Sequence, residues 1–265
     1  MPNLNRELYL ACDSGRVRRV REILDCHHRV DVNWMNDYNQ GITGLHVACI
    51  RGHLEIISLL LRHPCIDVNQ KDNCGRTPFY VACAYGRSSV VALMSKDSRV
   101  LINEPNENGF TPLSRAAYLG HPEVINAMIA SGRLFYPGHH SGNDCAIVKA
   151  RSIGNAAVVS LLERYKDHPD DTRHLVRLEV GWYDSMSAEV FSMVVLLCDD
   201  YFVLGERNGG DGGSKTRRFF AIVQQLPMEL QMFLCCRVGG STKERIAVKD
   251  IDLALKSSFG YLCAA

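Results

Sequence analysis

Apolar residues recur along much of the chain at the spacing of amphipathic helices, and the helical stretches come in pairs separated by a glycine. In residues 72–103 a Thr-Pro pair precedes one apolar pattern, Gly86 follows it, and a second apolar pattern comes next. This order predicts a helix, a turn and a second helix. The unit recurs every 34 residues, as three sets of positions show: Gly52, Gly86, Gly120 and Gly154; Ala48, Ala82, Ala116 and Ala150; Thr43, Thr77 and Thr111.

A repeat of this length predicts a solenoid, because one short helix pair cannot bury its own apolar face and needs a neighbour on each side. The units resemble the ankyrin repeat, whose pattern is DxxGxTPLHxAxxxGHxxVVxxLLxxxxxDVN. The resemblance covers about residues 5–165. It implies an all-α fold, an ankyrin repeat solenoid of helix-turn-helix units with β-turn or hairpin loops, followed by a helical C-terminal region.

We expect the solenoid to occupy residues 1–166. Its repeats are predicted near 6–36, 37–71, 72–105 and 106–138, with a degenerate fifth repeat at 139–166. The first repeat lacks the Thr-Pro pair and carries a basic segment, Arg16–Arg21. A terminal repeat must present one polar face to water, so we interpret this segment as a solvated face rather than an RNA-binding arm.

The 34-residue period ends after Tyr165. The charged, proline-containing residues 166–173 predict a boundary, and residues 167–265 are expected to form a helical extension. Within it, residues 187–204 predict a mostly buried helix that caps the last repeat. Residues 205–214 contain five glycines and predict a flexible loop. The loop ends Gly-Gly-Ser-Lys-Thr, in which Ser214 interrupts the order that a phosphate-binding loop requires.

Near the C-terminus, Leu-Pro-Met-Glu-Leu at residues 226–230 breaks one helical pattern and starts another. This stretch resembles the opening of an F-box and the F-box-like ends of some viral ankyrin proteins. The resemblance covers residues 218–235, and later F-box landmarks, including a tryptophan, are missing. It implies docking on the adaptor subunit of cullin-type ubiquitin ligases; a plain helical cap is the alternative. The docking ridge would consist of Leu226, Pro227, Leu230 and Leu234.

Composition narrows the classes of function. With 30 basic and 29 acidic residues the formal charge is +1, so no broad field favours nucleic acid or an anionic membrane. The longest apolar stretch, residues 190–198, is too short to span a bilayer, and the N-terminus lacks the pattern of a leader. We therefore expect a cytoplasmic protein, with entry into the nucleus left open.

No arrangement of side chains in the sequence predicts a catalytic, metal or cofactor site. The eleven cysteines include no CxxC pair, which favours reduced thiols in small core sites over zinc or disulfides. His46 lies in the turn before a helix and is interpreted as structural, while His139 and His140 lack neighbouring ligands. No Ser/His/Asp, Cys/His or paired-carboxylate arrangement stands out. We expect a protein that is not an enzyme, has no cofactor or metal, and acts on no small-molecule substrate.

The resemblance implies that partners bind on the concave face formed by the turn tips and the first helix of each repeat. Tyr85, Phe110, Tyr118 and Leu119 stand out at positions that are usually variable and exposed. Buried aromatic residues with arginine carry most interface energy, about 2 kcal/mol or more each. Packing against the neighbouring repeat or the long loop is the alternative. The repeat register assigns these residues to the face: Asp37, Asn39, Gln40, Ile42, Arg51, Lys71, Asn73, Arg76, Tyr85, Glu107, Asn108, Phe110, Tyr118 and Leu119.

The sequence therefore predicts a non-enzymatic scaffold or adaptor that binds other proteins on this face. The second hypothesis is a substrate-recognition subunit of a cullin-type ubiquitin ligase. In ankyrin proteins the asparagine of Asp-Val-Asn resembles the position that an asparaginyl hydroxylase modifies. This implies hydroxylation of Asn33 and Asn69, with a structural turn asparagine as the alternative.

Overall fold

The computed structural model describes residues 4–26, 30–133, 146–183, 186–188 and 235. The chain forms two compact units, residues 1–176 and residues 177–265. The predicted cap beyond residue 188, the glycine loop 205–214 and the F-box-like residues 226–234 lie outside the described residues, as do His139 and His140.

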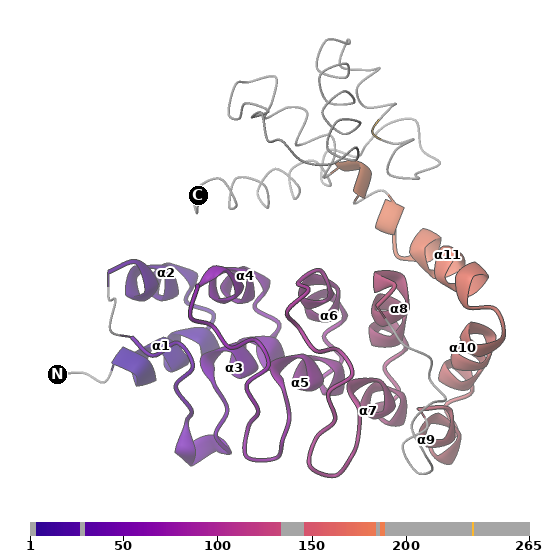
Figure 1. Ribbon diagram of the computed structural model, residues 1–265, viewed down its shortest axis with the longest axis horizontal. Coiled ribbons are helices and arrows are strands. Elements are labelled where there is room, and N and C mark those ends of the chain that lie inside the picture. The colour runs from indigo at the N-terminus through magenta and orange to yellow at the C-terminus, as the bar shows by residue number, and fades with distance from the viewer. Residues whose placement is uncertain (1–3, 27–29, 134–145, 184–185, 189–234, 236–265) are drawn as a thin grey trace, which may run out of the picture. The chain divides into compact units, whose positions relative to one another are not determined.

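The first unit is a stack of antiparallel helix pairs, and the prediction of an all-α fold is confirmed. The first helices of the pairs form one layer and the second helices form the other (Figure 1). The pairs are α1 (Leu4–Asp13) with α2 (Val17–Cys26), α3 (Gly44–Arg51) with α4 (Leu54–Arg62), α5 (Pro78–Ala84) with α6 (Ser88–Ser95), α7 (Pro112–Leu119) with α8 (Pro122–Ser131), and α9 (Ala146–Ser152) with α10 (Ala156–Asp167).

The recurring threonine starts the first helix of a pair. The side chains of Thr77 and Thr111 accept hydrogen bonds from the backbone N–H groups of Tyr80 and Ser114, at 3.1 and 3.2 Å. A proline follows each of these two threonines, at a position where its missing N–H costs no helical hydrogen bond. The sequence pattern thus sets where α5 and α7 begin.

In the second pair, Gly44 stands where the later pairs have proline, and His46 reinforces the turn. The Nδ1 atom of His46 accepts a hydrogen bond from the backbone N–H of Thr43 at 3.2 Å. Its Nε2 atom lies 2.9 Å from the carbonyl oxygen of Arg76 in the next pair. His46 is fully buried, so this imidazole joins two neighbouring repeats. That is the structural role predicted for it.

The recurring glycine ends the first helix. Gly52 and Gly120 are the C-caps of α3 and α7 and have φ of +83° and +73°, a left-handed conformation that side chains disfavour. The chain then reverses into the second helix of the pair. Between pairs it extends into hairpin loops, and the first of them contains the short 3₁₀ helix η1 (Asp37–Asn39).

A fifth helix pair follows the four that the regular pattern predicts. Helix α9 packs against α7, while α10 packs against α9 and α8, so the stack continues. After His168 the chain enters α11 (Pro169–Glu179). The charged residues 166–173 are thus largely helical, and the hydroxyl of Thr172 donates a hydrogen bond of 3.0 Å to the carbonyl oxygen of Arg164.

Small thiols fill part of the core. Cys12, Cys49 and Cys83 occupy the same place in successive repeats, are fully buried and carry free thiols. Burial in apolar surroundings raises the pKa of the Cys12 thiol to about 12 and raises the pKa values of the other two as well. These thiols therefore behave as small apolar side chains.

Candidate partner-binding hollow

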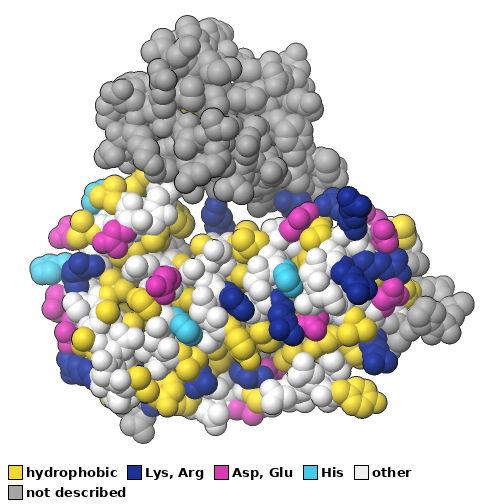
Figure 2. Space-filling view, turned by 180° about the vertical axis from the view of Figure 1, so that it is seen from behind, with side chains coloured by type: hydrophobic (Ala, Val, Ile, Leu, Met, Phe, Trp, Pro, Cys, Tyr) yellow, Lys and Arg dark blue, Asp and Glu magenta, His cyan; other side chains and the backbone are white. Residues whose placement is uncertain are grey.

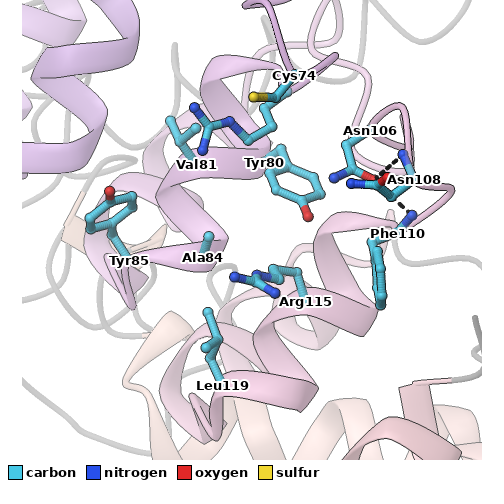
Figure 3. A pocket seen from close by; sticks show the side chains of 11 residues that line it. Cys74, Tyr80, Val81, Ala84, Tyr85, Asn106, Asn108, Phe110, Arg115 and Leu119 are labelled. Carbon is cyan, nitrogen blue, oxygen red and sulfur yellow. Dashed lines mark hydrogen bonds between the residues drawn. The ribbon is translucent and has the colours of Figure 1, made fainter. Parts of the chain in front are cut away.

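A hollow of about 440 Å³ lies between α5 and α7, at the base of the hairpin loops (Figure 3). Its walls come from two consecutive repeats, the third and the fourth. They consist of Cys74, Arg76, Tyr80, Val81, Ala84, Tyr85, Asn106, Asn108, Phe110, Arg115 and Leu119.

Helix α5 forms one wall and helix α7 the opposite wall. Tyr80 and Val81 are buried, and Figure 3 shows the Tyr80 ring pointing from α5 into the space that Arg115 approaches from α7. Ala84 adds only a methyl group to the first wall, which leaves room between the helices. The hollow therefore lies where the small Ala84 side chain on α5 faces the long Arg115 side chain on α7.

The hairpin that carries Phe110 is held by its own hydrogen bonds. The side-chain oxygen of Asn106 accepts from the backbone N–H groups of Asn108 and Phe110, at 3.2 and 2.9 Å (Figure 3). The N–H of Asn106 in turn donates to the carbonyl oxygen of Phe110 at 3.0 Å. An asparagine that closes a turn in this way fixes the backbone. The backbone that carries Phe110 is thus set before any partner arrives.

Apolar side chains are exposed around the rim. Tyr85 is 52% exposed and Leu119 is 39% exposed, and both line the hollow with Phe110. The hollow therefore brings together three of the four residues that stand out in the sequence. The fourth, Tyr118, lies on α7 outside the hollow, where the Arg115 guanidinium sits 5.6 Å from the centre of its ring.

Both charged residues of the lining are arginines. The Nε atom of Arg76 lies 2.7 Å from Oδ2 of the fully buried Asp72 side chain, and its Nη2 atom donates to Oε1 of Gln40 at 2.7 Å. Arg115 has no such acidic partner among the described residues. Near the rim, the ammonium group of Lys149 on α9 lies 4.6 Å from the centre of the Phe110 ring.

The remaining predicted residues of the face are not brought into the hollow. Arg51 pairs with Asp13 at 2.8 Å, and Lys71 pairs with Glu104 at 2.7 Å. The side-chain amide of Asn39 donates to the Tyr9 hydroxyl at 2.9 Å. The other exposed residues of the set are Asp37, Gln40, Asn73 and Glu107.

Ile42 corrects the prediction of an exposed contact residue. Its apolar side chain is only 4% exposed, at the base of the first hairpin, which the antiparallel β-bridge between Ile42 and Asn36 closes. Ile42 therefore contributes to the core and not to a binding surface.

Asn33 and Asn69 join neighbouring loops. The side-chain amide of Asn69 donates to the carbonyl oxygen of Arg99 at 2.8 Å and accepts from the N–H of Leu101 at 2.8 Å. Asn33 makes the same two bonds one repeat earlier, with Cys65 and Asp67. This geometry favours the structural interpretation of both asparagines, since both polar ends of each amide are in use.

Several residues of the hollow are not predicted by the sequence analysis. Arg115 could have been found, because it stands 34 residues after Val81, where the preceding repeats carry valine. Tyr38 also stands out in the structure, because it is 100% exposed at the tip of the first hairpin. The other lining residues that sequence reasoning missed are Cys74, Tyr80, Val81, Ala84 and Asn106.

The basic segment of the first repeat is balanced by acidic neighbours. Arg19 pairs with Glu7 and Glu22, and Arg21 lies 3.6 Å from Glu55. Figure 2 shows basic and acidic side chains interspersed over the face it presents. Within the described residues, no cluster of His, Cys, Asp and Glu could hold a metal ion, and no helix is long and apolar enough to cross a membrane.

Comparison with known proteins identifies the repeats. The family model for ankyrin repeats, which represents three copies, matches residues 8–103 and residues 66–136. No curated protein matches the chain. The matched segment runs from within α1 to the end of α8 and so covers the first four helix pairs. Residues 8–136 are therefore ankyrin repeats, which are typically protein–protein interaction modules.

Proposed function

We propose that the chain is a non-enzymatic interaction module that binds a partner protein in the hollow between α5 and α7. One observation carries this proposal: Tyr85, Leu119 and Phe110 surround a hollow of about 440 Å³ while retaining exposed surface. Aromatic and apolar anchors around a pocket are the groups that dominate the energy of protein interfaces.

The walls of the hollow need little rearrangement to bind. Helices α5 and α7 belong to internal repeats that pack against neighbours on both sides, and the Asn106 side chain fixes the hairpin of Phe110. A surface that is already ordered loses less conformational entropy on association, which favours affinity. The buried, reduced thiols of the core are typical of the cytoplasm, where we place this function.

A second function follows from the Leu-Pro-Met-Glu-Leu stretch at residues 226–230. The F-box-like pattern favours a subunit of a cullin-type ubiquitin ligase, in which the repeats hold the substrate and the ridge of Leu226, Pro227, Leu230 and Leu234 holds the adaptor. This stretch lies outside the described residues, so the hypothesis rests on the sequence pattern.

Quantitative affinity capture with the full chain tests both functions in one experiment. The first variant combines Tyr85→Ala with Phe110→Ala. Its control combines Leu54→Ala with Leu101→Ala, since these leucines are 40% and 50% exposed on α4 and on the loop after α6, away from the hollow. Each lost anchor is worth about 2 kcal/mol, so we expect the first variant to lose its specific partner at least tenfold and the control to keep it.

The ligase arm uses Leu226→Asp combined with Leu230→Asp. If the second function holds, this variant loses a cullin adaptor while it keeps the partner bound in the hollow. Equal recovery of every partner by wild type and by the Tyr85 and Phe110 variant would contradict the first function. Failure of the wild type to recover any cullin adaptor would contradict the second.

A further inference from the structure

The hollow carries positive charge that the described part of the protein does not neutralise. Its lining includes two arginines and no Asp or Glu. The charge of Arg76 is already balanced, because the buried Asp72 carboxylate lies 2.7 Å from its Nε atom. The excess charge therefore belongs to Arg115.

Arg115 is held in place by a ring rather than by an acid. Its guanidinium lies 5.6 Å from the centre of the Tyr118 ring, while the side chain points from α7 into the space facing α5 (Figure 3). Stacking on an aromatic face leaves the N–H groups at the edge of the guanidinium available to an acceptor. A carboxylate matches this edge, since it can accept two parallel hydrogen bonds from it.

A second cation lies next to the same apolar wall. Lys149 is the residue 34 positions after Arg115, and its ammonium group lies 4.6 Å from the centre of the Phe110 ring. No ion pair of Lys149 occurs among the described residues. Phe110 and Arg115 thus line the same hollow, and Lys149 from α9 adds a second cation against the Phe110 ring, so a carboxylate next to an apolar group in the hollow would meet a positive environment.

We propose that the hollow binds a segment of a partner protein in which an Asp or Glu side chain adjoins a large apolar side chain. The apolar side chain packs on Phe110, Tyr85 and Leu119, and the carboxylate pairs with Arg115, with Lys149 adding attraction. This inference rests on the proposed function, because it specifies the chemistry of the partner that the hollow takes.

The test is a selection of random linear peptides, displayed without free C-termini, on the immobilised full chain. Selected peptides are then synthesised with blocked ends, and their dissociation constants are measured by fluorescence anisotropy. We expect the selected sequences to share an Asp or Glu next to Leu, Ile, Phe or Met. We also expect binding to weaken as salt is added, because attraction between the charges is screened.

Substitutions then locate the carboxylate. We expect Arg115→Gln to weaken binding by roughly 30-fold or more, the usual effect of truncating one partner of a buried charge pair. The matched control is Arg18→Gln, because Arg18 is an exposed arginine of α2 on the other layer, and we expect no change from it. Replacing the acidic residue of the peptide by its amide should weaken binding to the wild type, yet have little further effect on Arg115→Gln.

The other outcomes contradict either this inference alone or both the inference and the proposed function. This inference would be overturned, and the proposed function would stand, in one case. In that case the selected peptides lose binding with Tyr85→Ala and Phe110→Ala, but they lack an acidic residue or are unaffected by salt and by Arg115→Gln. If no peptide is selected, or if selected peptides ignore Tyr85→Ala and Phe110→Ala, this inference and the proposed function both fail. A preference for free C-termini over internal acidic side chains, measured with matched synthetic peptides, would also overturn the inference.

Discussion

His46 is a residue whose burial should make stability depend on pH. Removal from water lowers its pKa from the ordinary value of 6.5, and this effect exceeds the opposing effects of the Arg76 carbonyl and the Asp72 charge. The folded protein therefore keeps the imidazole neutral at pH values where the unfolded chain binds a proton. The contribution of His46 to the free energy of unfolding is fully present above pH 6.5 and declines as the pH falls below 6.5.

The expected result is a free energy of unfolding that falls with decreasing pH by up to about 1.4 kcal/mol per pH unit, the slope for one proton. Urea unfolding of the wild type and of His46→Gln, measured at several pH values from neutral to mildly acidic, checks this. The Gln variant should be less stable at neutral pH and should have a shallower slope. Parallel slopes for the two proteins would show that His46 does not carry the dependence.

At the scale of elements, the hairpins contain a matched pair of glycines. Gly75 and Gly109 occupy the same position in successive hairpins and have φ of +71° and +76°. A Cβ atom added at Gly75 would lie 2.7 Å from the backbone nitrogen of Glu107, which donates to the carbonyl oxygen of Cys74. A Cβ atom added at Gly109 would meet nothing within 4 Å.

Gly109→Ala should therefore cost only the strain of a left-handed residue, about 1 kcal/mol. Gly75→Ala should cost about 3 kcal/mol, because it also pushes apart two hairpins that share a hydrogen bond. Thermal or urea unfolding of the two variants gives the comparison. Equal losses of stability would mean that the hairpins do not support one another as the structure indicates.

The elements also show which parts of the fold the sequence can predict. Threonine caps and terminal glycines recur every 34 residues, so the pattern predicts the helix pairs from local chemistry repeated several times. Helix α11 has no such support: it lies beyond the last 34-residue unit, and only Thr172 and Val176 are buried on it. Ile42 shows a different limit, because it is buried while Arg76 and Phe110, at the same point of the next two repeats, keep exposed surface.

The candidate site was predictable in part for the same reason. The register places Tyr85, Phe110 and Leu119 on one face because each lies at a fixed point of its repeat. It does not show that the small side chain of Ala84 leaves a hollow there, nor that Asp72 neutralises Arg76 and leaves Arg115 available. These features depend on side chains that meet across two repeats, so they emerge only once the repeats are stacked.

At the scale of the whole molecule, the position of the hollow within the stack of repeats determines how its two walls are supported. Helix α5 packs against α3 and α7, and α7 packs against α5 and α9, so repeats on both sides support the two walls. In a solenoid each repeat is stabilised by its neighbours, and a site on internal repeats keeps its shape when the ends fray. The fifth helix pair, beyond the segment that the ankyrin family model matches, therefore has a clear structural role.

The most direct test of the central claim is photo-crosslinking from single positions of the full chain in cells. A photoreactive phenylalanine analogue is placed at Tyr85 or at Leu119, on opposite walls of the hollow, and at Leu54 on α4 as the control. If a partner binds in the hollow, both wall positions crosslink to the same protein and the control position does not. Crosslinking of that protein from Leu54, or of no shared protein from the two walls, would contradict the assignment of the hollow as the binding site.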